Sequence, residues 1–123
     1  MSDYMAGACN IGPSEVKRRK QGAAIGAILY FVTALTFILT DAPTATRYIT
    51  FIPALLFSVG YFQSRRKFCV AYGFLGVFNF EKIGSTKKVT INQDLAADRK
   101  YAARLLLQSA VVAIVLTSVV IFI

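Results

Sequence analysis

The residues best suited to chemistry in this chain are two cysteines, Cys9 and Cys69, because the sequence contains no histidine. Histidine is the commonest metal ligand and general base, so its absence removes most metal and acid–base sites. Two thiolates fall short of the four ligands of a structural zinc site. Two interpretations of this thiol pair stay open: small buried residues kept reduced at a cytoplasmic face, or a redox pair or metal site completed by other groups.

The sequence has no arrangement typical of a catalytic or cofactor-binding site. Paired carboxylates, a serine–histidine pair, a Walker loop and a dinucleotide fingerprint are all missing from it. No ionisable residue lies at the centre of the second or third hydrophobic stretch, where ion pathways usually place one. We therefore expect no enzymatic activity, no cofactor, no metal and no nucleic-acid partner.

The composition instead indicates a membrane protein. Of the 123 residues, 56% are hydrophobic and only 16% are charged, and the mean hydropathy is +0.58. A soluble domain of this size could not bury so much apolar surface, which argues against a soluble enzyme, a disordered tail or a disulfide-rich secreted module. The length suits one domain, so we expect a single membrane domain over 1–123.

Three apolar stretches without charged residues, at 21–40, 48–64 and 105–123, predict an all-α fold with three transmembrane helices near 21–40, 47–64 and 105–123. About 20 residues of helix are needed to cross a bilayer, and the second stretch is near the lower limit. The sequence predicts these segments: an N-terminal arm at 1–12, a first helix at 13–40, a second at 47–64, a loop at 81–92 and a third helix at 93–123.

Local signals support the helix boundaries. Pro13 fits the first position of the first helix, where its missing N–H is not needed. Glu15 and Arg19 stand four residues apart, in the order that favours an ion pair on a helix. The pattern from Thr90 to Gln93 resembles a capping box, which predicts that the third helix starts near Ile91.

The segment at 68–80 is apolar except for Asn79 and is too short to cross a bilayer. Its thirteen residues reach about 20 Å as a helix. Basic clusters flank it on both sides. We therefore expect a short interfacial or re-entrant segment on the cytoplasmic side.

The distribution of basic residues predicts the orientation. Of the fourteen lysines and arginines, thirteen lie at 17–20 or within 64–104, and Arg47 alone lies in the hairpin at 41–47. Because basic residues favour the cytoplasmic side, we expect the N-terminus inside and the C-terminus outside. A cleaved secretory signal is the competing interpretation of the first stretch. Its twenty-residue length favours an uncleaved anchor.

Small residues on the first helix indicate close helix packing. Gly22 and Gly26 form a Gly-x-x-x-Gly pattern, which Ala23 and Ala27 overlap. Such a face lets two helices approach closely. The partner helix is either in the same chain or in a second copy of it, and the sequence leaves both open.

Basic residues next to the predicted spans are candidates for binding anionic lipid headgroups, because each attracts an anionic membrane surface. The candidates are Lys17, Arg18, Arg19, Lys20, Arg65, Arg66, Lys67 and Arg104.

Two segments carry a family resemblance. The start, Cys9-Asn-Ile-Gly-Pro-x-Glu-Val-x-Arg-Arg, and the segment from Phe68-Cys69 to Gly76-Val77-Phe78-Asn79-Phe80 resemble a group of small, uncharacterised bacterial membrane proteins. The resemblance covers most of the chain and implies a bacterial inner membrane location and a recurring architecture without a known activity.

The function we expect is that of a non-catalytic structural or accessory membrane protein, acting through self-assembly or as a small subunit of a larger complex. Its partners would be anionic lipids and other membrane helices. The alternative is a small oligomeric channel or transporter whose path is lined by Thr33, Thr36, Ser58, Gln108, Ser109 and Thr117.

Overall fold

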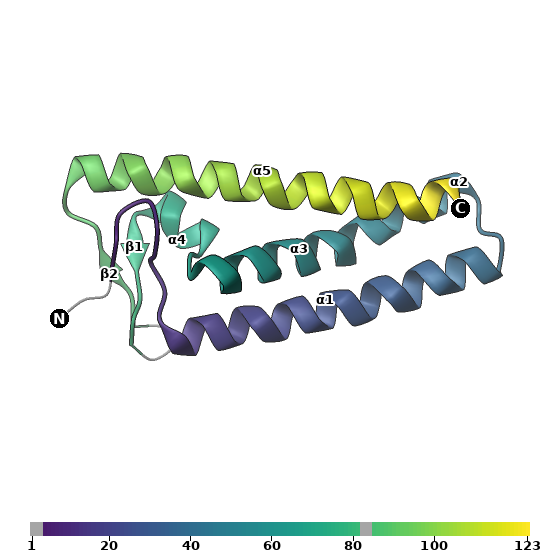
Figure 1. Cartoon of the computed structure of the whole chain (residues 1–123), viewed down its shortest axis with the longest axis horizontal. Coiled ribbons are helices and arrows are strands. Elements are labelled where there is room, and N and C mark those ends of the chain that lie inside the picture. The colour runs from purple at the N-terminus through teal and green to yellow at the C-terminus, as the bar shows by residue number, and fades with distance from the viewer. Residues whose placement is uncertain (1–3, 82–84) are drawn as a thin grey trace.

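The computed structural model describes residues 4–81 and 85–123 and is mostly helical. Three long helices lie side by side, with α3 between α1 and α5 (Figure 1). Their bounds are α1 Pro13–Leu39, α3 Phe51–Arg66 and α5 Asn92–Phe122. The shorter elements are α2 Thr44–Arg47, the 3₁₀ turn η1 Tyr48–Thr50, α4 Val70–Leu75, and the strands β1 Val77–Phe78 and β2 Lys87–Lys88. The mostly helical fold expected from the sequence is confirmed.

Two of the helices, α1 and α5, are long and apolar enough to cross a membrane. Only 22% of the most apolar 18-residue window of α1 is buried, and 28% of that of α5. A core helix of a soluble protein would bury far more of such a window. The α3 helix has 16 residues, but α2, η1 and α3 follow one another without a break, so the helical run extends from Thr44 to Arg66.

The α1 and α3 helices approach each other closely because glycines lie at the contact. A Cβ added to Gly26 would lie 2.8 Å from the Cα of Phe57 on α3. A Cβ added to Gly60 on α3 would lie 2.8 Å from the backbone nitrogen of Ala23 on α1. Only glycine fits at such contacts, since the facing atoms are backbone and cannot move aside.

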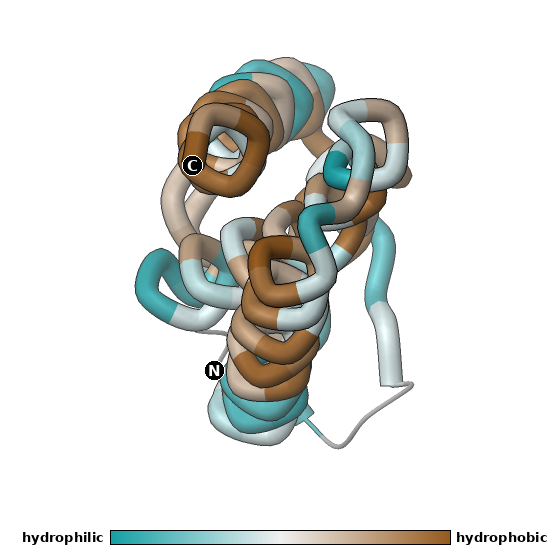
Figure 2. The backbone as a smooth tube through the Cα atoms, turned by 90° about the vertical axis from the view of Figure 1, so that its right-hand side faces the viewer, coloured by the Kyte–Doolittle hydropathy of each residue, from teal (hydrophilic) through white to brown (hydrophobic). Residues whose placement is uncertain are grey.

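The buried side of the helices carries small and hydroxyl side chains, and the exposed side carries large apolar ones. The hydroxyls of Ser58, Ser109 and Thr117 are buried and donate to carbonyls four residues earlier in their own helices. Residues that expose more than half of their surface include Ile28, Phe31, Leu35, Ile52, Leu107, Val115 and Phe122. This distribution suits an apolar solvent, because helices in lipid pack through small residues. Figure 2 shows the apolar colouring at the C-terminal end of α5.

Arg47 closes the end of the helices where α5 ends. Its side chain is buried, and its Nη1 donates to the carbonyl of Val120 at 2.9 Å. Its Nε donates to the carbonyl of Ala42 at 2.9 Å, and Asp41 lies 3.6 Å from its Nη2. A cation at this position satisfies one of the last carbonyls of α5 and opposes the negative end of its dipole.

The opposite end of the molecule carries a folded head, which we define as residues 4–12, 67–81 and 85–104. The arm at 4–12 is tied to α5 because Tyr4 Oη and Gly7 N both donate to the buried carboxylate of Asp98, at 2.6 and 2.7 Å. Burial and the neighbouring Asp98 raise the pKa of Tyr4. Strands β1 and β2 pair antiparallel, with Val77 opposite Lys88. The sequence did not predict these strands, since two residues give no readable alternation.

The predicted capping box at the start of α5 is wrong. The residue at the N-cap is Ile91, in extended conformation, and no side chain hydrogen-bonds the first turn. Thr90 therefore lies one position too early to cap the helix, because capping requires the hydroxyl at the N-cap itself.

Candidate functional site

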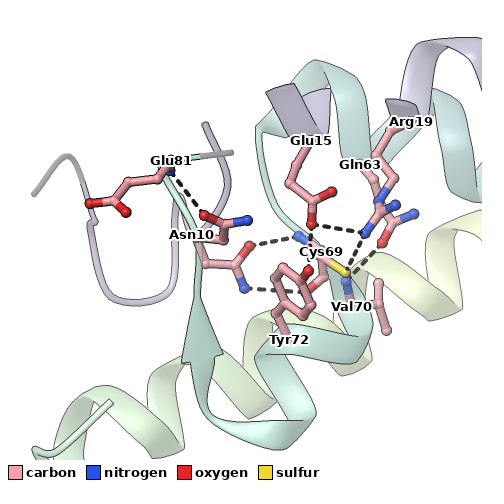
Figure 3. Close-up of polar contacts among 9 residues, drawn as sticks. Asn10, Glu15, Arg19, Gln63, Cys69, Val70, Tyr72 and Glu81 are labelled. Atoms are coloured by element: carbon pink, nitrogen blue, oxygen red, sulfur yellow. Dashed lines mark hydrogen bonds and ion pairs between the residues drawn. The ribbon is translucent and has the colours of Figure 1, made fainter. Parts of the chain in front are cut away.

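A buried asparagine joins the N-terminal arm to the turn that follows α3. The Oδ1 atom of Asn10 accepts from the backbone N–H of Cys69 at 2.7 Å, and its Nδ2 donates to the carbonyl of Cys69 at 3.2 Å (Figure 3). The backbone N–H groups of Asn10 and Ile11 both donate to the carbonyl of Lys67. Because Asn10 is fully buried, these bonds hold two distant segments in one geometry.

The same arm also lies against the residues after β1. Asn79 N donates to the carbonyl of Asn10 at 2.9 Å, and Gly12 N donates to the carbonyl of Asn79 at 2.8 Å. The Oδ1 atom of Asn79 accepts from the backbone N–H of Glu81 at 2.9 Å. The N-terminal arm and the segment at 68–80 therefore pack against each other.

A buried charged network lies beside the hydrogen bonds between Asn10 and Cys69, on the first turns of α1. The Tyr72 hydroxyl donates to Glu15 Oε2 at 2.5 Å, and Arg19 Nη2 lies 3.8 Å from the same oxygen. Arg19 Nη2 also donates to the Sγ atom of Cys69 at 3.1 Å (Figure 3). The predicted ion pair between Glu15 and Arg19 is confirmed. Burial, followed by the hydrogen bond and charge of Glu15, raises the pKa of Tyr72 to about 12.

The structure places both cysteines in the head. Cys69 is a buried free thiol that contacts Arg19, and Cys9 is half-buried with its Sγ atom 3.9 Å from the carbonyl of Ile11. The two lie on neighbouring segments, since Asn10 binds the backbone of Cys69. Within residues 4–81 and 85–123, no group of three or more histidine, cysteine or acidic residues is placed to hold a metal ion.

Three lysines surround a pocket on the surface of the head. Lys17 and Lys20 come from α1, and Lys67 comes from the turn that ends α3. The cavity has a volume of about 460 Å³. No acidic residue is among the described residues that line it. The pocket therefore combines cations that are far apart in sequence.

The wall of this pocket is mainly apolar. Ile11, Pro13, Val16 and Phe80 line it, and Cys9 lies at its edge. An apolar wall with a few converging charges is typical of sites for small amphiphilic molecules. We call this cavity the lysine pocket.

The other predicted headgroup residues lie around the same end of the molecule. Arg65 stacks on Tyr61 and Arg66 on Phe62, with the guanidinium carbons 6.0 and 5.8 Å from the ring centroids. Arg104 lines a shallow hollow of about 220 Å³ with Lys100 and Tyr101. All of the predicted headgroup residues are exposed except Arg19, which points into the buried network instead.

The small residues predicted to mediate packing do not act alike. Gly26 and Ala23 lie in the contact between α1 and α3, and Ala27 is half-buried. A Cβ added to Gly22 would meet no atom within 4 Å. Gly26 therefore contributes to the packing of helices within the chain, whereas the space beside Gly22 is empty.

Several polar residues that hold the head together were not predicted from the sequence. Four of them lie in the head: Asn10, Tyr72, Asn79 and Asp98. The fifth is Gln63 at the end of α3, whose Oε1 accepts from the backbone N–H of Val70 at 2.9 Å. The available signal was a polar residue isolated among small or apolar neighbours, which marks a buried hydrogen-bonding group when the chain folds over it.

No protein-family model, curated protein or solved structure matches this chain.

Proposed function

We propose that this chain is a non-catalytic structural or accessory protein of the membrane, which crosses the bilayer three times and acts by assembling with other membrane helices. The observation that carries the proposal is the apolar exterior of α1 and α5, most of which is exposed. In water such a surface would drive aggregation, whereas in a bilayer it is the surface that contacts lipid.

The third crossing in this proposal is the continuous helical run from Thr44 to Arg66. Twenty-three helical residues span about 34 Å, which matches the hydrocarbon core of about 30 Å. The head then lies at the cytoplasmic surface, where the exposed cations meet anionic lipid. The α4 helix and strand β1 stay on that side, as a short surface element in which α4 packs against α5 and reaches α1 through the hydrogen bond from Tyr72 to Glu15.

Assembly is supported by unfilled packing surface on the same helices. Gly22 has open space beside it. Because a small residue in a membrane helix allows a second helix to approach, this position could receive another helix. Large apolar residues are exposed along all three helices. These features suit a packing module, either with further copies of this chain or within a larger complex.

Accessibility of introduced cysteines tests the topology. Thr44→Cys and Lys87→Cys are made in a background where Cys9 and Cys69 are serine, and intact cells are treated with a membrane-impermeant maleimide. We expect Thr44→Cys to react in intact cells and Lys87→Cys to react only after permeabilisation. The reverse pattern would invert the proposed orientation, and a C-terminal reporter active only in the cytoplasm would exclude an odd number of crossings.

Native mass spectrometry from mild detergent tests assembly, because it gives copy number and foreign subunits together. We expect the wild-type protein to appear as an oligomer or with another subunit.

Flux of ions into liposomes tests the alternative, a channel or transporter. Reproducible flux from the purified protein would overturn the accessory role.

A further inference from the structure

We propose that the lysine pocket is a binding site for one anionic phospholipid, with the phosphate between Lys17, Lys20 and Lys67 and the first apolar carbons against Val16 and Phe80. This inference rests on the proposed membrane location, and it makes the expected lipid contact specific. The expectation from the sequence was a diffuse attraction by all the basic clusters. The structure instead brings three lysines from two segments to one cavity.

The positions of these lysines are fixed by the fold. Lys17 and Lys20 are three residues apart on α1, so they lie on one face of the helix. Lys67 ends α3 in the left-handed conformation, with φ of 52°. Its carbonyl accepts from the backbone N–H groups of Asn10 and Ile11. The arm therefore holds Lys67 next to the first turns of α1.

The charge of the pocket is not compensated by the protein. None of the three lysines takes part in an ion pair with the residues that the structure describes. The nearby carboxylate of Glu15 is buried and engaged by Tyr72 and Arg19. The pocket also lies at the start of α1, where Gly12 provides no side-chain cap and the helix dipole is positive. An anion is the ligand that balances this arrangement.

The size and lining of the pocket favour a lipid over a free inorganic ion. Its volume of about 460 Å³ falls within the range of about 300–1,000 Å³ found for small-molecule sites. Inorganic phosphate would leave the partly exposed apolar side chains of Val16 and Phe80 in contact with water. A phospholipid headgroup would fill both parts of the cavity, since a phosphate and an apolar chain are joined in one molecule.

The decisive experiment compares two triple variants that each remove three positive charges from the same end of the protein. The pocket variant is Lys17→Gln, Lys20→Gln, Lys67→Gln. The control variant is Arg18→Gln, Lys87→Gln, Lys88→Gln, whose residues are exposed and do not line the pocket. The full-length protein is purified in mild detergent, titrated with phosphatidylglycerol or phosphatidylcholine, and analysed by native mass spectrometry.

We expect the wild type and the control variant to retain one phosphatidylglycerol, and the pocket variant to bind it roughly two orders of magnitude more weakly, given the contribution of each lysine near an anionic headgroup. Equal weakening in both triple variants would show diffuse attraction and overturn the proposal. Equal retention of phosphatidylcholine would overturn the role of charge. Displacement of the lipid by millimolar inorganic phosphate would identify free phosphate as the ligand.

A second readout uses the thiol at the edge of the pocket. Cys9 lines the cavity, whereas Cys69 is buried. We expect phosphatidylglycerol to slow the reaction of Cys9 with a small maleimide in the wild type and not in the pocket variant. Unchanged labelling in the wild type would place the lipid elsewhere. Carbonate extraction of membranes tests the membrane location separately, so a wild-type protein that is inserted in the membrane but retains no phosphatidylglycerol would refute this inference alone.

Discussion

Replacing Gly26 by alanine should destabilise the protein, whereas the same replacement at Gly22 should not. At Gly26 the new Cβ would lie 2.8 Å from the Cα of Phe57, even closer to its backbone nitrogen, and 3.0 Å from the carbonyl carbon of Leu56. These are backbone atoms of α3, so α1 and α3 would have to separate. At Gly22 nothing lies within 4 Å of the added atom.

The difference between the two variants can be estimated because they share one favourable effect. Replacing glycine by alanine inside a helix stabilises by about 0.5–1 kcal/mol. Overpacking a tight contact costs about 1–3 kcal/mol. Gly22→Ala should therefore be neutral or stabilising, and Gly26→Ala should unfold more easily than Gly22→Ala by about 1–3 kcal/mol.

The assay is reversible unfolding in mixed micelles, with increasing sodium dodecyl sulfate and helix content followed by circular dichroism. A Gly26→Ala variant as stable as Gly22→Ala would refute the close contact between α1 and α3. The larger replacement Gly22→Leu extends the test to assembly. If α1 meets another copy at Gly22, this variant should lose the oligomer seen by native mass spectrometry while the folded monomer remains.

Two further predictions concern the network in the head. Asn10→Ala would leave the buried N–H of Cys69 without its partner, while the carbonyl of Cys69 would keep its hydrogen bond from the backbone N–H of Gly73. One unpaired buried group costs about 1–3 kcal/mol, so we expect a loss of that size in the same unfolding assay. The exposed control Asn92→Ala should change stability by less than about 0.5 kcal/mol, and equal effects of the two would contradict the hydrogen bonds between Asn10 and Cys69. Tyr72 should titrate near pH 12 instead of near 10, which the tyrosinate absorbance of the wild type minus that of Tyr72→Phe would measure. Because the pKa of Tyr72 is raised in the folded state, its contribution to stability is complete below pH 10 and is lost as the pH rises through about 12. The wild type should therefore lose more stability than Tyr72→Phe across that range. A difference titration centred at pH 10 would show that Tyr72 does not meet Glu15.

Local features of the helices could be predicted from the sequence. Pro13 begins α1 as expected, and the pairing of Glu15 with Arg19 follows from a spacing of four residues. Both depend on residues close together in the chain. The start of α5 was predicted to within one residue, near Ile91, although the capping box that indicated it is wrong, because such a pattern is short and occurs by chance. The strands β1 and β2 were not predicted, because two residues are too few to show the alternation of a strand.

The candidate site depends on contacts between segments far apart in the chain, which the sequence does not encode in any local pattern. Arg19 has the same charge and neighbourhood as Lys17 and Lys20, yet it points inward to Cys69 while they line the lysine pocket. That division arises because α4 and the turn after α3 cover only one side of the first turns of α1. In the same way Gly22 and Gly26 look equivalent in sequence, and the backbone of Leu56 and Phe57 on α3 makes only Gly26 a packing contact. Composition and periodicity determined that this chain forms apolar helices with a basic end, because those properties follow from residue type and local geometry. The packing of α3 and the N-terminal arm decided which of the similar residues became buried, paired or exposed.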